Sequence, residues 1–203
     1  MSSRTYRSTL VGVTALLGVA AGIPAATVEA KPQRPKLVTV SMTAVVEFVD
    51  DSLGVLCSDV APGDVITATY TFDPLTPDTN PLDVVGDYFQ QASGAGFRVD
   101  LGDAVTETDP GNIVFLVEVV NDYPGDYYVV RSYNNLPLSC GSTVSHIGWQ
   151  LDDPTGTAFR STDLSRKAPD LEDFVSFFGL DIEGQDYETG AYFRIRAHVV
   201  SAK

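Results

Sequence analysis

The sequence holds few of the residues from which metal sites and nucleophilic active sites are built. Among its 203 residues are two histidines, His146 and His198, one tryptophan and two cysteines. It also lacks the HExxH and GxSxG motifs, the Walker loop and the dinucleotide-binding fingerprint. These absences exclude the enzyme classes that the motifs define. His146 falls in an alternating apolar and polar stretch, so we expect it to have a structural role.

Basic residues are scarce as well. Lysine and arginine number 13 against 27 aspartates and glutamates, which gives a net charge of −14. Nucleic acids and anionic membrane surfaces are bound by basic patches, so neither is an expected partner. The acids are spread over many loops, as is typical of a solvated acidic surface. Cations and neutral partners such as sugars remain compatible with this charge.

Long hydrophobic runs are missing except near the start of the chain. There a basic beginning precedes the apolar residues 10–23, and Pro24 ends the run. The run is too short to cross a bilayer comfortably, which takes roughly 20 apolar residues. Together with the small residues of the following VEA, it predicts a cleaved signal peptide over residues 1–30 and therefore a secreted, extracellular protein.

Cleavage after residue 30 would leave an ordinary single domain. It removes two arginines and one glutamate, so that 11 basic and 26 acidic residues remain and the net charge becomes −15. Residues 31–36, KPQRPK, are expected to form an extended leader. Residues 37–203 are long enough to bury a core of their own, and we expect them to be a monomeric domain.

The two cysteines are predicted to form a structural disulfide, Cys57–Cys140. An even cysteine count in an exported chain usually indicates a bridge, with two free buried thiols as the alternative. No CxxC motif is present, which argues against a redox role. Because the bridge would close a long loop, the chain-entropy estimate of its stabilisation is about 4 to 5 kcal/mol.

Alternation of apolar and polar residues is the main pattern after the signal peptide. Every second residue of 38–48 is apolar, and in 65–73 three threonines alternate with larger apolar residues. Glycine- and proline-containing turns separate such stretches. The pattern predicts an all-β fold, an antiparallel, jelly-roll-like β-sandwich. Strands are expected at 38–48, 65–73, 87–91, 96–101, 112–120, 126–133, 145–153, 157–161 and 192–200.

One segment has the period of a helix instead. In residues 169–180, PDLEDFVSFFGL, apolar residues recur at helical spacing and Asp170 is suited to cap the first turn. We expect one short helix here, with its apolar side over an open end of the sandwich.

The order of short motifs along the chain carries a resemblance to a known family. The motifs are GDVITATYTFDPLTPD (63–78), GDYF (86–89), VDLGD (99–103), VVNDYPGDYY (119–128), WQLDDPTGTAFRSTDL (149–164) and APDLEDF (168–174). This series resembles uncharacterised secreted bacterial β-sandwich domains that occur in exported proteins with a PEP-CTERM sorting tail. The resemblance implies an exported β-sandwich and brings no catalytic residues. The chain ends in RAHVVSAK without the sorting tail, so this member is expected to be released.

Aspartates gather in loops that offer other oxygen donors. Calcium takes six to eight oxygen ligands, and the candidate ligands of a structural calcium are Asp73, Asp78, Asp83, Asp152 and Asp153. No stretch fits the DxDxDG loop. The prolines of residues 73–83 equally fit a turn in which proline sets φ and aspartate accepts backbone hydrogen bonds. Both interpretations stay open at this point.

Aromatic residues offer a second type of site. Glycan-binding sandwiches use exposed aromatic rings with polar groups beside them, and the candidates here are Tyr123, Tyr127, Tyr128, Tyr133 and Trp149. Strand alternation puts Tyr127 and Tyr128 on opposite faces, so only part of this set can face solvent together. Strand tyrosines that pack with a wet hydroxyl are the competing interpretation.

The sequence therefore favours a secreted, non-catalytic domain with a binding or structural role outside the cell. Its expected partner is an extracellular glycan or a surface protein, with calcium as the one cofactor to consider. The alternative is an extracellular polysaccharide hydrolase or lyase that uses paired carboxylates, because such enzymes need two acids at a suitable separation.

Overall fold

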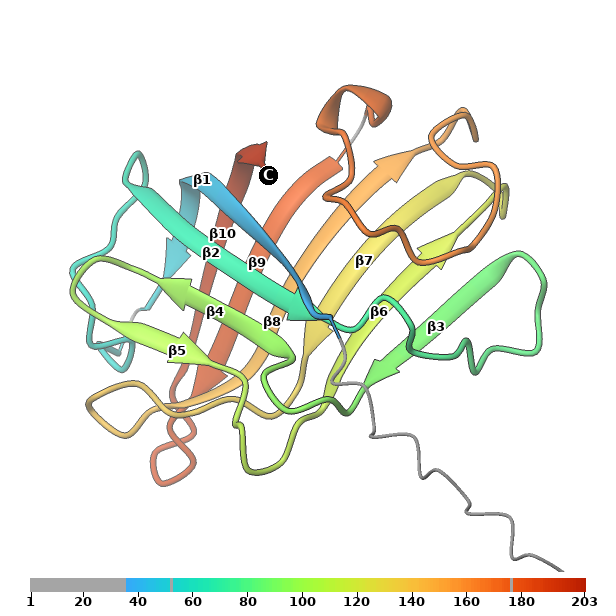
Figure 1. Cartoon of the computed structure of the whole chain (residues 1–203). Helices are drawn as coiled ribbons and strands as arrows, with labels where there is room; N and C mark the ends of the chain where they lie inside the picture. Colours follow the sequence, from blue (N-terminus) through green and yellow to red (C-terminus); the bar gives the residue numbers. More distant parts are fainter. Residues whose placement is uncertain (1–35, 52, 176) are drawn as a thin grey trace, which may run out of the picture. The chain divides into compact units, whose positions relative to one another are not determined.

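Ten antiparallel β-strands form one continuous sheet in the computed structural model (Figure 1). The structure describes residues 36–51, 53–175 and 177–203. The strands are β1 (Val38–Asp50), β2 (Val65–Phe72), β3 (Val85–Gln90), β4 (Gly96–Asp100), β5 (Val105–Glu107), β6 (Phe115–Val120), β7 (Asp126–Ser132), β8 (Thr143–Asp153), β9 (Phe177–Gln185) and β10 (Tyr192–Ala202). Their order in the sheet is β3-β6-β7-β8-β9-β10-β1-β2-β4-β5.

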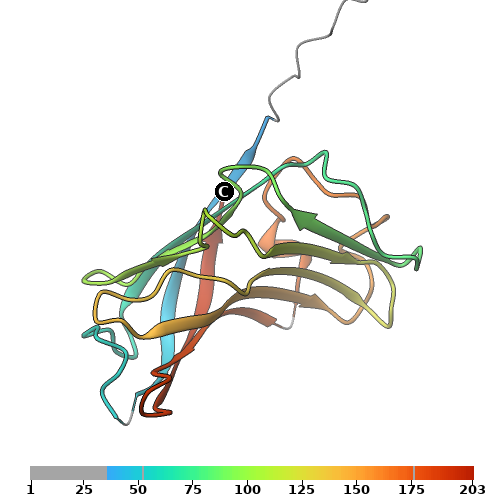
Figure 2. The ribbon, with the colours of Figure 1, turned by 90° about the horizontal axis from the view of Figure 1, so that it is seen from below.

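The sheet curls into a half-barrel, so that its two halves face each other (Figures 1 and 2). Tyr70 on β2 meets Trp149 on β8 with ring centroids 5.8 Å apart. The hydroxyl oxygens of Tyr70 and Tyr128, on β2 and β7, lie 2.9 Å apart in a buried hydrogen bond. The predicted all-β antiparallel fold is confirmed. The two layers are the two halves of a single curled sheet.

The two-residue period of the strands decides which side chains enter the core. In β1, Val40 and Met42 are buried on the concave face, whereas Thr39 and Ser41 are exposed on the convex face. Burying a large apolar side chain stabilises the fold by roughly 1.5–3 kcal/mol. The largest fully buried side chains include Trp149, Tyr70, Phe72, Phe97, Phe115 and Phe193.

The β5 edge of the sheet is covered by the segment that follows β7. Thr108 and Asn135 form an antiparallel bridge, and the Leu136 N–H donates to the Glu107 carbonyl oxygen at 2.7 Å. Behind the bridge, the Ser132 hydroxyl lies 2.7 Å from that of Thr108 and donates to Asn135 Oδ1 at 2.6 Å. Because an open strand edge is a template for aggregation, this cover protects the β5 edge.

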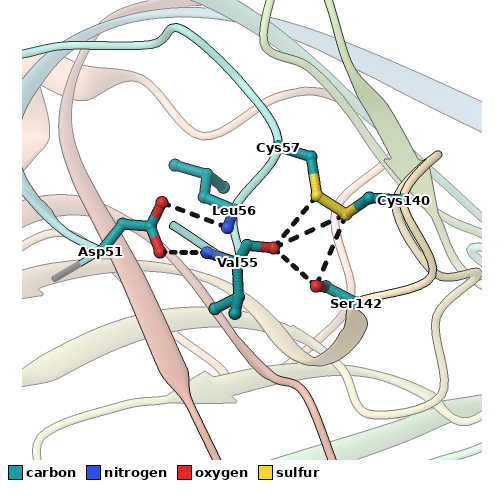
Figure 3. The surroundings of a disulfide bond; sticks show 6 residues. All are labelled: Asp51, Val55, Leu56, Cys57, Cys140 and Ser142. Atoms are coloured by element: carbon teal, nitrogen blue, oxygen red, sulfur yellow. Dashed lines mark hydrogen bonds between the residues drawn. A yellow bond between two sulfur atoms is a disulfide. The ribbon is translucent and has the colours of Figure 1, made fainter. Parts of the chain in front are cut away.

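The predicted disulfide Cys57–Cys140 is confirmed (Figure 3). The two Cα atoms are 6.1 Å apart and the bridge spans 83 residues of sequence. The Ser142 hydroxyl donates to the Val55 carbonyl oxygen at 2.5 Å, and the Val55 N–H donates to Asp51 Oδ1 at 2.7 Å. The bridge therefore ties the β1–β2 connection to the β7–β8 connection.

The predicted short helix is present as a single 3-10 turn, Leu171–Asp173 (η1). Asp170 caps it as expected, because its Oδ1 accepts a hydrogen bond from the Glu172 N–H at 3.1 Å. Phe174 follows the turn and packs edge-on against Phe159, with ring centroids 5.6 Å apart. The turn thus lays an apolar residue on the core, as predicted for the helix.

The last part of the expected helical stretch, residues 177–180, belongs to β9. Leu180 and Ile182 are fully buried and pair in register with Trp149 and Ile147 of β8. Their two-residue period competes with the helical period of the preceding apolar residues, and pairing with β8 and β10 on both sides decides in favour of the strand.

Two further expectations differ from the structure. Residues 157–161 are a loop and not a strand, since buried aspartates bind their backbone N–H groups instead of a neighbouring strand. The short strand β5 was not predicted, because three residues carry too little alternation to be recognised.

We expect removal of the disulfide to destabilise the domain by about 4 to 5 kcal/mol, because the bridge closes a long loop in the unfolded chain. The comparison is between wild type and a Cys57→Ser, Cys140→Ser double variant in guanidinium denaturation. Reduced wild-type protein is the control, and it should match the double variant. Equal midpoints for oxidised and reduced protein would contradict the expectation.

Candidate functional site

A strip of charged and aromatic side chains crosses the convex face of the sheet from β7 to β10. Strand register sets its order: Arg131, Gly148, Asp181 and Arg196 form one row, and His146, Glu183 and Arg194 are paired in the next. We call this set the convex strip. Its members are Arg131, Tyr133, His146, Asp181, Glu183, Tyr192, Arg194 and Arg196.

Ion pairs hold one side of the convex strip in place. Arg194 Nη2 lies 2.9 Å from Asp181 Oδ1, and Arg194 Nε lies 3.1 Å from Glu183 Oε1. Arg196 Nε is also 3.2 Å from Asp181 Oδ1. Partial burial opposes charge on Arg194, but its hydrogen bond to Asp181 and the two nearby carboxylates outweigh this and raise its pKa. The side chains on β9 and β10 are therefore held in a defined arrangement.

His146 occupies the other side of the strip. Its ring lies against the ring of Tyr133, with centroids 5.6 Å apart, and covers the backbone of Gly148. A Cβ atom at Gly148 would come within 2.5 Å of His146 Cε1, so glycine is required for the ring to lie there. Burial lowers the pKa of His146, opposed by the charge of Glu183. The imidazole is therefore mostly neutral near pH 7.

Beside His146 the convex face is hollowed. A small hollow of about 50 Å³ has Arg131, His146, Gln150 and Asp181 around it, and Gly148 and Gly179 contribute no side chain to fill it. Arg131 is half-buried, and among the described residues no carboxylate oxygen lies within 4 Å of its guanidinium. Its N–H groups are thus not engaged in an ion pair.

A pair of carboxyl groups adjoins Arg131. Glu118 on β6 is the cross-strand neighbour of Asp87 on β3, on the same convex face. Burial raises the pKa of Glu118; the charge of Arg131 lowers it and that of Asp87 raises it again, with a net upward shift. Glu118 therefore keeps its proton to higher pH than an ordinary glutamate.

The aspartates of the 73–83 loop act as turn residues. Asp73 Oδ1 accepts a hydrogen bond from the Leu75 N–H at 2.9 Å. Asp78 Oδ1 accepts from the N–H groups of Asn80, at 2.8 Å, and Asp87, at 2.9 Å, which fastens the loop to the edge strand β3. Asp83 is exposed.

Asp153 organises the loop after β8 from a fully buried position. Asp153 Oδ1 accepts hydrogen bonds from the Thr155 hydroxyl, at 2.6 Å, and from the Thr155 N–H, at 2.9 Å. Asp153 Oδ2 accepts from the N–H groups of Thr157 and Ala158. The Thr155 hydroxyl and the Thr157 N–H contribute most to lowering the pKa of Asp153. Its neighbour Asp152 is half-buried and accepts from Gln150 Nε2 at 2.8 Å.

The predicted calcium ligands therefore do not converge. Across 36–51, 53–175 and 177–203, no group of three or more acidic, histidine or cysteine side chains is arranged to hold a metal ion. The contacts described for Asp73, Asp78 and Asp153 are those of hydrogen-bond acceptors in turns. The geometry supports the turn interpretation, and the calcium prediction receives no support from it.

The structure buries two of the five candidate aromatic ligands. Tyr128 is 3% exposed and Trp149 is fully buried, and both face the concave core, where their rings contact Tyr70. Tyr123 is exposed in the β6–β7 loop, whereas Tyr127 is half-buried on the convex side of β7. These candidates, Tyr123, Tyr127, Tyr128 and Trp149, therefore do not share one accessible surface.

Of the two tyrosines on the convex strip, Tyr133 is one of the candidates named from the sequence, and sequence reasoning missed Tyr192. Tyr133, 46% exposed, follows β7, and Tyr192, 42% exposed, begins β10. Alternation alone assigns Arg131 and Arg194 to outward-facing positions. Only the strand order brings β7, β8, β9 and β10 together, and the sequence contains no local signal of that order.

Comparisons with protein-family models, with curated proteins and with solved structures give no match to this chain. The described part of the chain contains no helix long and apolar enough to cross a membrane. The disulfide is compatible with an extracellular protein, since such bridges persist in oxidising compartments.

We expect Asp153→Asn to lower the melting temperature by several degrees at pH 7, because the amide replaces a charged acceptor of five hydrogen bonds. A carboxyl whose folded pKa is lowered stabilises above its unfolded pKa, about 3.9, and loses this contribution as the pH falls. The difference between variant and wild type should therefore shrink below about pH 4. Melting curves from pH 7 to pH 2 test this, with the exposed Asp83→Asn as control. A difference independent of pH would contradict the charge argument.

Proposed function

We propose that this protein is an exported, non-catalytic domain that binds an extracellular glycan through the convex strip. The observation that carries the proposal is the pairing of two exposed tyrosines, Tyr133 and Tyr192, with fixed charged and hydrogen-bonding side chains between them. Tyrosine offers an apolar face for a sugar ring, and Arg, His and carboxylate groups are suited to sugar hydroxyls.

The shape of the strip supports binding along an open surface. Its hollow of about 50 Å³ is far smaller than the roughly 300–1,000 Å³ of sites that enclose small molecules. A polysaccharide chain lying across the strands would contact side chains that their own ion pairs already hold in position. Such preorganisation lowers the entropy cost of binding.

Export forms part of the same proposal. The apolar segment 10–23, the disulfide and the resemblance to secreted domains of PEP-CTERM-associated proteins support it. The acidic composition supports a partner other than nucleic acid.

We expect Tyr133→Ala and Tyr192→Ala each to weaken glycan binding by about fivefold or more, as truncation of a contacting aromatic residue does. Affinity electrophoresis in gels containing soluble plant, algal or bacterial polysaccharides measures the effect for residues 31–203. Tyr123→Ala is the matched control, since Tyr123 is exposed at the opposite end of β7 from Tyr133. Binding that survives both strip variants would place the site elsewhere, and retention by no polysaccharide would contradict the function.

A polysaccharide hydrolase or lyase is the second candidate, on one observation. An open hollow of about 430 Å³ between residues 168–172 and 200–202 is lined by two acids, Asp170 and Glu172. If these acids act on a polysaccharide, the wild-type protein should release reducing or unsaturated ends, and Glu172→Gln should abolish the release. A wild-type protein that binds glycans without releasing such ends is a binding domain.

A further inference from the structure

The positive charge of this acidic protein is concentrated on the convex strip. Three of the six arginines in the described residues, Arg131, Arg194 and Arg196, lie there. The mature chain would carry a net charge of −15, so an anionic partner would be repelled by most of its surface. Two carboxylates, Asp181 and Glu183, accompany the three arginines, so the formal charge of the convex strip is +1, against −15 for the mature chain.

The three arginines differ in what they already bind. Arg194 and Arg196 share the carboxylate of Asp181, and Arg194 also binds Glu183. Arg131 has no carboxylate oxygen within 4 Å among the described residues. Asp181 lines the same hollow as Arg131, but its carboxylate is already paired with Arg194 and Arg196. Arg131 is therefore the arginine with donors left for a ligand.

Space for a small anion exists directly beside Arg131. Gly148 and Gly179 leave the hollow of about 50 Å³, which is bounded by His146, Gln150 and Asp181. A single water needs roughly 10–15 Å³ by this kind of measure, so the hollow admits a group of a few atoms. A sugar ring does not fit within it. A carboxylate does, and its planar geometry matches the two parallel N–H donors of a guanidinium.

Tyr133 lies beside this hollow, because its ring contacts that of His146, which lines the hollow. A ring carrying a carboxylate that points into the hollow would lie over the exposed part of Tyr133. We propose that the hollow at Gly148 and Gly179 is a subsite for the carboxylate of an acidic sugar, bound by Arg131, with the sugar ring on Tyr133. This inference rests on the proposed glycan-binding function and names the class of glycan: a uronate-containing polysaccharide.

Polygalacturonate and its methyl ester form a matched pair of probes, since esterification removes the charge and keeps the ring. We expect residues 31–203 to bind polygalacturonate at least about tenfold more tightly than the ester in isothermal titration at about 50 mM salt. Arg131→Ala should remove this preference, since hydrogen bonds to a charged group are worth about tenfold or more. Arg131→Lys keeps the positive charge but lacks the paired N–H donors, so this variant should retain only part of the preference for polygalacturonate.

Arg98→Ala is the control variant, because Arg98 is an exposed arginine of β4 that pairs with Glu107 outside the strip. It should bind both probes as wild type does. Circular dichroism melts establish whether each variant is folded. If Arg131→Ala is not folded, Arg131→Gln repeats the test, because glutamine keeps part of the aliphatic stem and a polar end without the charge.

The outcomes separate this inference from the function on which it rests. Equal binding of polygalacturonate and its ester, unchanged in Arg131→Ala but lost in Tyr133→Ala, would overturn the carboxylate subsite and leave glycan binding standing. Tighter binding of dextran sulfate than of polygalacturonate would overturn the preference for a carboxylate. Binding to none of these and to no neutral polysaccharide would overturn both.

Discussion

The structure depends on the burial of one face of a long sheet against itself. Tyr70, Tyr128 and Trp149 come from β2, β7 and β8, and their rings meet across the concave core. Burial raises the pKa of Tyr70 and of Tyr128. Both hydroxyl groups therefore stay protonated throughout the physiological pH range, and the hydrogen bond between them is kept. A sheet that buries its concave face this completely leaves its convex face to water.

Two buried carboxylates fix the conformation of the loops at one end of the sheet. Asp126 and Asp153 are cross-strand neighbours at one end of β7 and β8. Asp126 accepts from the N–H groups of Asp122 and Phe159, and Asp153 accepts from the 155–158 loop. A buried carboxylate is tolerated only when its oxygens are satisfied. These aspartates therefore serve as substitutes for strand pairing in segments that have no neighbouring strand.

On the convex face, two glycines shape the surface. Gly148 lets the ring of His146 lie flat on the backbone, and Gly148 and Gly179 together leave the small hollow beside Arg131. Ion pairs among Asp181, Arg194 and Arg196 keep the adjoining side chains from collapsing into it. A surface of this kind, with fixed donors and exposed tyrosines at both ends, is better suited to holding an extended polymer than to enclosing a small substrate.

Much of the fold was determined by local sequence. Alternation predicted most strands of the sheet, because a strand's faces are set by its own two-residue period, and the disulfide followed from the cysteine count. The 3-10 turn at Asp170 also follows from local capping. The tertiary structure decided which outward-facing residues became neighbours. Strand order united Arg131, His146, Asp181 and Arg194, and the curl of the sheet buried Tyr128 and Trp149 while leaving Tyr133 and Tyr192 exposed. Such contacts join residues far apart in sequence, so no local pattern encodes them.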